Sequence, residues 1–527
     1  MKKMSRRDFT TLCGGSLAMG GMIASWFKPL AAVAAMSNAT DDQLADLTLL
    51  EASTRIHNGT VTSTQLTKAL LARISVYDPK VNSYITVMAT EALKQSAHLD
   101  EEARAGKFRS PLHGIPISLK DNIDTAGTRT TAASPMFRTR IPDADAEVVT
   151  KLKASGAVIL GKLNLHEFAL GCTGDVSYFG PSRNPWNLEL VTGGSSGGSG
   201  AAVAADLCYG ALGTDTGGSI RVPSSWCGIV GIKPTTGLVS IRGIIPCLAS
   251  LDHCGPMART VEDVALMLTQ LAGYDNLDIF SVEHPQQDYY KLMQQPVSSF
   301  RLGAPVEYYD HLEPEVADIV AAATEVLARL TRGITSHASL PDIPQGEDFF
   351  ATLGDTAAYH APLIKQAGLN YMPPTVIEMK AMTTAPSTAA DSAASHTELV
   401  MIRRTIDAAF KEIDLVVVPT TTSLPKPIKD SLKVEMSDGK PKKVYDFFDP
   451  TSGCTNTSPF DIYGIPALTL PCGFSKSGMP VGLMIAGPHF SEGKILALAY
   501  AFQQATDWHK RKPPLTPDTP TPPLAEV

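Results

Sequence analysis

The sequence lacks the features typical of nucleic-acid-binding proteins, metal-binding proteins and repeat proteins. Its 45 Lys and Arg are outnumbered by 53 Asp and Glu, for a net charge of −8, so no basic excess points to nucleic acid. The eight cysteines form no Cys-x-x-Cys motif and the histidines are scattered, so we expect no metal and no cofactor. There is no internal repeat. What remains is a globular protein whose hydrophobic content of 44% supplies an ample core.

The first 35 residues resemble an export signal. Basic residues within 2–7 precede an apolar, glycine-rich run over about 9–27 and a small-residue stretch at 31–35. The run is shorter than the ~20 residues that a membrane span needs. The segment Ser5–Phe9, SRRDF, resembles the twin-arginine signal of bacteria. We therefore expect residues 1–35 to be removed and the remaining protein to be periplasmic or secreted, without a membrane anchor.

Removal of this signal would leave seven cysteines, an odd number that does not suggest a disulfide framework. Cys247 and Cys254 lie close enough in sequence to pair in an oxidising compartment, or to remain two core thiols. The sequence leaves both alternatives open.

Helical patterns alternate with short apolar strands, which predicts one α/β layered domain over residues 40–510. Thr62 and Gln65 form a capping box that opens a helix. Few patterns typical of strands occur over 275–400. We interpret this region as helices and loops that cover the cleft and shape a substrate pocket. Residues 511–527 are a proline-rich tail, expected to be extended. The expected helices are 47–59, 62–74, 89–106, 145–155, 164–170, 201–205, 260–272 and 493–506, and the expected strands are 115–119, 157–160, 228–232, 415–418, 467–470 and 483–486.

The most informative stretch is Thr192–Pro223, TGGSSGGSGAAVAADLCYGALGTDTGGSIRVP. Nine of its 32 residues are glycine, although the whole chain has 41 in 527. Glycine costs backbone entropy on folding, so such a cluster requires either positive φ or a very close backbone approach. Two serines, Ser195 and Ser219, lie on the glycine-rich turns. Consecutive glycines let a loop direct several N–H groups to one point, which is the geometry of an oxyanion hole.

A serine nucleophile needs a base, and no histidine lies near either turn in sequence. Lys120 ends the apolar strand of the segment GIPISLKDNID. Burial can lower the pKa of a lysine by up to about 3–5 units, towards neutrality. Taken alone, however, the position of Lys120 favours a surface pair with Asp121 or Asp124 over a catalytic role.

Three other interpretations of the glycine-rich stretch compete with this one. Gly193–Gly197 matches the G-x-S-x-G nucleophile elbow, but neither a strong preceding strand nor an HGGG-type loop accompanies it. A phosphate-binding loop would need a GxxxxGK[ST] or GxGxxG pattern, and the stretch contains no lysine. The glycines could also serve only tight packing.

These motifs together resemble the amidase signature family. The resemblance rests on GGSSGGSGAAVA, GTDTGGSIRVPSSWCGIVGIKPT, GIPISLKDNID, DAEVVTKLKASGAVILGKLNLHEFALG, FGPSRNPWN, SLDHCGPMARTVEDV and SPFDIYGIPALTLPCG, and it extends from about Leu47 to Trp508. It implies a single α/β/α sandwich around a large, twisted, mixed sheet. One departure is the Val176-Ser177 pair, where the family often has Asn-Ser.

The resemblance also implies roles for individual residues. Ser219 would be the acyl-forming nucleophile, Ser195 the bridging serine after a cis peptide bond, and Lys120 the base. The backbone N–H groups of Thr216, Gly217, Gly218 and Ser219 would form the oxyanion hole. Three further residues would support this loop without taking part in the chemistry: Ser196, Asp215 and Arg221.

The resulting hypothesis is an amidase that hydrolyses a small-molecule carboxylic amide. Two alternatives are a glutaminase-type subunit of an amidotransferase that acts on aminoacyl-tRNA, and an esterase on the same fold. The export signal argues against the first, because aminoacyl-tRNA is cytoplasmic. A catalytically dead binding protein is a further alternative, which intact Lys120, Ser195 and Ser219 disfavour. The substrate and any homo-oligomer stay open.

Overall fold

The computed structural model describes residues 41–344, 347–384, 387–431, 434–437, 440–443 and 453–523. The expected export signal, residues 1–35, lies outside the described residues.

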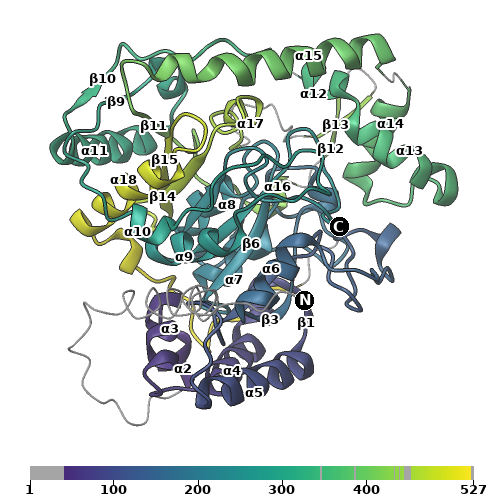
Figure 1. The fold of residues 1–527 in the computed structure, drawn as a ribbon. Coiled ribbons are helices and arrows are strands. Elements are labelled where there is room, and N and C mark those ends of the chain that lie inside the picture. Colours follow the sequence, from purple (N-terminus) through teal and green to yellow (C-terminus); the bar gives the residue numbers. More distant parts are fainter. Residues whose placement is uncertain are drawn as a thin grey trace, which may run out of the picture.

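An eleven-stranded mixed sheet forms the centre of the molecule (Figure 1). Its strand order is β1 (Tyr84–Val87), β3 (Val158–Leu163), β2 (Pro116–Lys120), β6 (Gly210–Asp215), β8 (His253–Ala258), β7 (Val230–Lys233), β14 (Ala467–Phe474), β15 (Pro480–Ala486), β11 (Leu415–Pro419), β9 (Leu302–Gly303) and β10 (Ile334–Thr335). The pairs among β3, β2 and β6 and among β11, β9 and β10 are parallel, and the remaining pairs are antiparallel. This confirms the expected α/β fold around a large mixed sheet.

Helices surround this sheet and bury its central strands on both faces. In Figure 1 the first helices gather at the bottom of the view, and α12 to α15 lie at the top. The helices are α2 (Asp41–Ala45), α3 (Leu49–His57), α4 (Ser63–Val81), α5 (Ala89–Arg104), α6 (Glu147–Ser155), α7 (Gly197–Ala204), α8 (Arg221–Cys227), α9 (Val261–Leu271), α10 (Tyr289–Leu292), α11 (Pro314–Leu330), α12 (Glu347–Leu353), α13 (Asp355–Ala367), α14 (Pro373–Thr384), α15 (Ala389–Thr405), α16 (Ile428–Ser431), α17 (Pro459–Ile462) and α18 (Glu492–Ala505).

Two short hairpins stand apart from the main sheet, β4 (Arg183–Asn184) with β5 (Asn187–Val191), and β12 (Val434–Ser437) with β13 (Lys440–Lys443). Within the described part of the chain, no helix is both long enough and apolar enough to cross a membrane.

The capping box predicted at Thr62 is present. The Thr62 hydroxyl accepts the Gln65 amide at 3.1 Å, and the Gln65 side chain accepts the Thr62 amide at 2.8 Å. Two of the N–H groups that the first turn of α4 leaves without helical partners are thereby satisfied.

The helix expected over 164–170 is wrong. Only a 3₁₀ turn, η2 (Glu167–Ala169), forms there, and Phe168 has φ of 50°. The amides of this segment bond to distant carbonyls instead: His166 to Ser195, Glu167 to Val176 and Phe168 to Ala132, at 2.8–3.0 Å. These long-range hydrogen bonds override the local helical pattern.

The region from 275 to 400 is mostly helical and loop structure, as expected, but it also supplies β9 and β10 at one edge of the sheet. Their short lengths explain why the sequence shows no strand signal. The proline-rich tail, described to residue 523, lies against the body of the protein. The Lys80 ammonium donates to the carbonyls of Pro517 and Thr519 at 3.0 and 2.7 Å.

We predict that Thr62→Ala lowers the free energy of unfolding by about 1 kcal/mol, because the N-cap acceptor is lost. Thr62→Ser keeps the hydroxyl and should stay within a few tenths of a kcal/mol of the parent protein. Urea unfolding of the two variants checks this. Equal losses in both would show that the methyl group, and not the cap, stabilises the helix.

Candidate active site

Lys120, Ser195 and Ser219 come from three neighbouring elements of the sheet region. Lys120 is the last residue of β2, which pairs in parallel with β6. Ser219 follows the end of β6, and Ser195 lies just before α7. The carboxyl ends of parallel strands meet at one edge of a sheet, where α/β proteins commonly bind ligands. All three side chains are buried, at 0–2% exposure.

The Lys120 amine is hydrogen-bonded within this buried site. Nζ lies 2.7 Å from Ser195 Oγ and 2.7 Å from Thr214 Oγ1. No carboxylate of the described chain lies within ion-pair distance of Lys120, so the surface pair with Asp121 or Asp124 is not formed; Asp121 pairs with Lys162 instead. Burial lowers the pKa of Lys120 to about 7. The amine can therefore be neutral near physiological pH.

Ser195 follows a cis peptide bond between Gly194 and Ser195, which agrees with the geometry that the family resemblance implies. The Gly194 amide donates to the Cys172 carbonyl at 2.7 Å. A Cβ at Gly194 would lie 2.6 Å from the Gly174 nitrogen. Glycine is required here because the neighbouring backbone leaves no room for a side chain.

Ser219 lies beside this segment, and its carbonyl accepts the Ser196 amide at 3.2 Å. Within the described residues its hydroxyl makes no hydrogen bond, either to Ser195 or to any other group. The expected link from Lys120 to Ser195 is thus present, whereas the link from Ser195 to Ser219 is not formed in this structure. Catalytic hydrogen bonds often tighten only when substrate binds.

Three of the four expected oxyanion-hole amides remain available. Among the described residues, no turn or capping hydrogen bond uses the amides of Thr216, Gly217 or Ser219. The Gly218 amide instead donates to Asp215 Oδ1 at 2.6 Å, so the expectation for Gly218 is not met. A Cβ at Gly218 would lie 2.1 Å from Thr457 Oγ1, which explains the glycine at this position.

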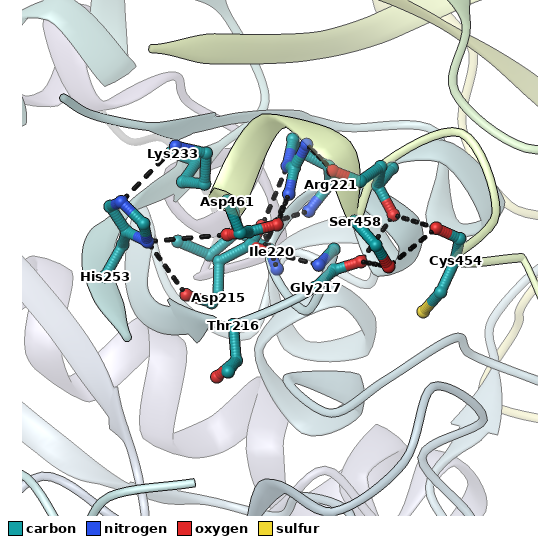
Figure 2. Close-up of polar contacts among 12 residues, drawn as sticks. Asp215, Thr216, Gly217, Ile220, Arg221, Lys233, His253, Cys454, Ser458 and Asp461 are labelled. Atoms are coloured by element: carbon teal, nitrogen blue, oxygen red, sulfur yellow. Dashed lines mark hydrogen bonds and ion pairs between the residues drawn. The ribbon is translucent and has the colours of Figure 1, made fainter. Parts of the chain in front are cut away.

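Behind the loop, Arg221 bridges two carboxylates (Figure 2). Its guanidinium lies 2.9 Å from Asp215 Oδ1 and 2.5 Å from Asp461 Oδ2, and all three side chains are fully buried. Burial alone would raise the pKa of Asp215, but the Arg221 charge outweighs it and holds this pKa well below its usual range. Asp215 therefore stays ionised and accepts the amides of both Gly218 and Ile220.

Figure 2 also shows His253 and Lys233 on the far side of Asp461. His253 Nδ1 lies 3.4 Å from Asp461 Oδ1. Burial, together with the Lys233 charge, lowers the pKa of His253 well below its usual value, so the imidazole is neutral. Burial also lowers the pKa of Lys233 to about 7, but Lys233 Nζ donates to the Ile465 carbonyl at 2.7 Å and contacts neither serine.

Sequence reasoning placed Ser196, Asp215 and Arg221 near the loop but missed its second anchor. The hydroxyls of Thr457 and Ser458 both donate to the Gly217 carbonyl, at 2.6 and 3.0 Å. Ser196 Oγ donates to the Thr214 carbonyl and accepts the Thr214 amide. The only available signal for the missed anchor was the motif SPFDIYGIPALTLPCG, which contains Ser458 and Asp461.

Cys247 and Cys254 are free thiols, and no disulfide joins any two of the described cysteines. Of the two alternatives that the sequence left open for Cys247 and Cys254, the structure therefore supports two thiols without a disulfide. Cys254 is buried in β8, and Cys247 is half-buried with its thiol directed at the Ala169 carbonyl.

Comparison with known proteins identifies the family. A family model described as Amidase matches residues 65–496. The chain belongs to the amidase signature family.

Curated relatives of this amidase-family chain include a glutamyl-tRNA(Gln) amidotransferase subunit from Moorella thermoacetica. It is 39% identical over 498 residues, covering 90% of this chain and 99% of the relative. The corresponding amidotransferase subunit from Roseiflexus sp. is 38% identical over 500 residues, with 90% and 99% covered.

Two solved structures are also similar to the amidase-family chain. The native peptide amidase of Stenotrophomonas maltophilia has a TM-score of 0.73 and 32% identity, covering 90% of this chain and 99% of that one. The 6-aminohexanoate cyclic dimer hydrolase has a TM-score of 0.79 and 27% identity, covering 89% and 99%.

We predict that Arg221→Met lowers the free energy of unfolding by about 3–5 kcal/mol, because two buried carboxylates lose their cation. Arg329, whose side chain is 68% exposed and pairs with Glu325 at 3.9 Å, provides the control. Arg329→Met should change stability by less than about 1 kcal/mol. Denaturant unfolding compares the two, and similar losses would contradict the importance of the buried cluster.

Proposed function

We propose that this protein is an amide hydrolase that forms an acyl intermediate on Ser219. The observation that carries the proposal is the 2.7 Å contact between Lys120 Nζ and Ser195 Oγ in a fully buried site. A desolvated amine without a carboxylate partner is suited to accept a proton near neutral pH. The adjoining loop offers N–H groups where an oxyanion would develop.

The reaction would proceed through Ser195. Ser219 Oγ attacks the amide carbon while its proton passes to Ser195, and the Ser195 proton passes to neutral Lys120. This step needs the Ser219 side chain to turn towards Ser195 once substrate is bound. The amides of Thr216, Gly217 and Ser219 would stabilise the oxyanion. The proton then returns through Ser195 to the leaving nitrogen as the C–N bond breaks. Water finally attacks the ester and releases the acid.

The second candidate is a glutaminase subunit of an amidotransferase. It is favoured by the 39% identity to a relative named as a glutamyl-tRNA(Gln) amidotransferase subunit. The same proton path would release ammonia from glutamine. Ammonia release from glutamine together with co-purification of a partner protein would support this candidate. Esterase activity is a third candidate, since an ester is an easier acyl donor than an amide. Hydrolysis of a panel of amides, esters and glutamine separates all three, and size measurement tests for a homo-oligomer.

We also propose that residues 1–35 direct export by the twin-arginine route, which would place the mature enzyme in the periplasm or outside the cell. The proposal rests on the sequence SRRDF and the apolar run that follows it. Cell fractionation with an Arg6→Lys, Arg7→Lys variant tests it. Unchanged location of the variant would contradict this route.

We predict that a fluorophosphonate labels Ser219, because this reagent reacts with activated serines in oxyanion holes. Ser219→Ala should abolish labelling and lower kcat by about 10⁴-fold or more. Ser196→Ala should still be labelled, because the Ser196 hydroxyl bonds to the Thr214 backbone. Intact mass and peptide mapping locate the adduct. An adduct on any residue other than Ser219 would refute the assignment.

We predict that kcat/KM rises with pH through a midpoint near the Lys120 pKa of about 7. The sign follows from the mechanism: below this pKa the ammonium cannot accept the proton, and above it the neutral amine can. A pH–rate profile measures the midpoint. Lys233→Met should keep it, although the pKa of Lys233 is also about 7, because Lys233 touches neither serine. A midpoint that disappears in Lys233→Met would show that Lys233, and not Lys120, is the titrating group.

A further inference from the structure

Asp252 belongs to the motif SLDHCGPMARTVEDV, to which the proposed mechanism gives no role. It directly precedes β8, which runs antiparallel to β6 with Asp215 opposite His253. Asp252 and Thr216 therefore lie side by side just beyond the end of this strand pair. The Asp252 side chain is buried.

The Asp252 carboxylate connects two segments that border the site. Oδ1 accepts the Thr216 hydroxyl at 2.5 Å and the Leu248 amide at 3.3 Å. Oδ2 accepts the Cys247 amide at 2.9 Å. One segment is the loop that carries the candidate oxyanion amides, and the other is the turn at 247–252.

All of these partners are neutral donors. No Lys, Arg or His of the described chain lies within ion-pair distance of Asp252, unlike Asp215, which is paired with Arg221. Burial raises the pKa of the Asp252 carboxyl, and the three donors directed at it oppose that rise because they stabilise the ionised form. The three hydrogen bonds hold the Asp252 carboxyl group between the two segments and thereby restrict the Thr216 side chain.

We propose that Asp252 is a positioning residue for the hydrolysis, holding Thr216 so that the amides of Thr216 and Gly217 face the developing oxyanion. This inference rests on the proposed function. Gly217 is already held at its carbonyl by Thr457 and Ser458. The Thr216 hydroxyl and the Gly217 carbonyl are attached at opposite ends of the peptide unit that carries the Gly217 amide, so loss of the Thr216 attachment would free this amide to rotate.

Asp252 also acts on Lys120 through its charge. Burial lowers the pKa of Lys120, and the groups that oppose this are Cys247, Asp252, Asp215 and Cys254. Removal of the Asp252 charge should lower this pKa further. The acidic limb of the pH–rate profile should then move to lower pH, an effect that a purely structural role would not produce.

The chain contains a closely matched control. The Asp78 carboxylate, in α4, accepts the Ser83 hydroxyl at 2.5 Å and the amides of Ser83 and Tyr84 at 2.8 and 3.1 Å. Asp78 thus has one hydroxyl and two amide partners, as Asp252 does, but it contacts none of the candidate catalytic residues. Asp78→Asn should cost stability without affecting the chemistry.

The experiment compares Asp252→Asn, Thr216→Val and Asp78→Asn in the full chain. We expect kcat to fall by about 10²-fold in the first two, with KM nearly unchanged, as for a misplaced catalytic group. Only Asp252→Asn should move the acidic limb to lower pH. Asp78→Asn should keep both kcat and the pH profile. If Asp252→Asn fails to fold, Thr216→Val still tests the proposal, because it removes the same hydrogen bond between Thr216 and Asp252.

Hydrogen exchange of the peptide containing residues 216–219 gives a readout that does not require turnover. It should be faster in Asp252→Asn and Thr216→Val than in Asp78→Asn. Equal exchange in all three, or a kcat for Asp252→Asn matching that of Asp78→Asn, overturns the role of Asp252 and leaves the proposed function intact. A parent protein that hydrolyses no substrate, while the exchange difference persists, overturns the proposed function instead.

Discussion

The contact on which the candidate site depends is the hydrogen bond between the Lys120 amine and the Ser195 hydroxyl. It places a lysine at the end of a strand that is buried along its whole length. Desolvation disfavours the ammonium form, and the described chain provides no carboxylate at ion-pair distance to restore it. The site thus keeps an amine that can hold or release a proton near neutral pH, which an exposed lysine cannot do.

The ion pairs that stabilise the glycine-rich loop after β6 do not include the Lys120 amine. Arg221 joins Asp215 and Asp461 behind the loop, and Lys233 and His253 lie beyond them. This arrangement fixes the loop backbone by ionic and hydrogen bonds and directs one amide, that of Gly218, away from the site. The remaining amides can then face a ligand. A carboxylate paired directly with Lys120 would have raised its pKa and removed the base.

Local sequence signals predicted much of the fold because they depend on nearby residues. The capping box at Thr62 is an example of such a signal. The close backbone approach expected of the glycine cluster is present at Gly194, but the neighbour that requires it, Gly174, is distant in sequence. The prediction failed at residues 164–170, where a helical pattern is present but the amides bond to carbonyls from other elements. It also missed β9 and β10, which have two residues each and become strands only because β9 pairs with β11 and β10 pairs with β9.

By itself, the sequence determined the family, the α/β class and the candidate residues Lys120, Ser195 and Ser219, because these are carried by residue types at characteristic spacings. The tertiary structure decided which groups are desolvated and which donors remain free. The low pKa of Lys120, the commitment of the Gly218 amide to Asp215, and the attachment of Gly217 to Thr457 and Ser458 all depend on the folded loop and its neighbours. Such contacts depend on packing in three dimensions, and no spacing along the chain encodes them.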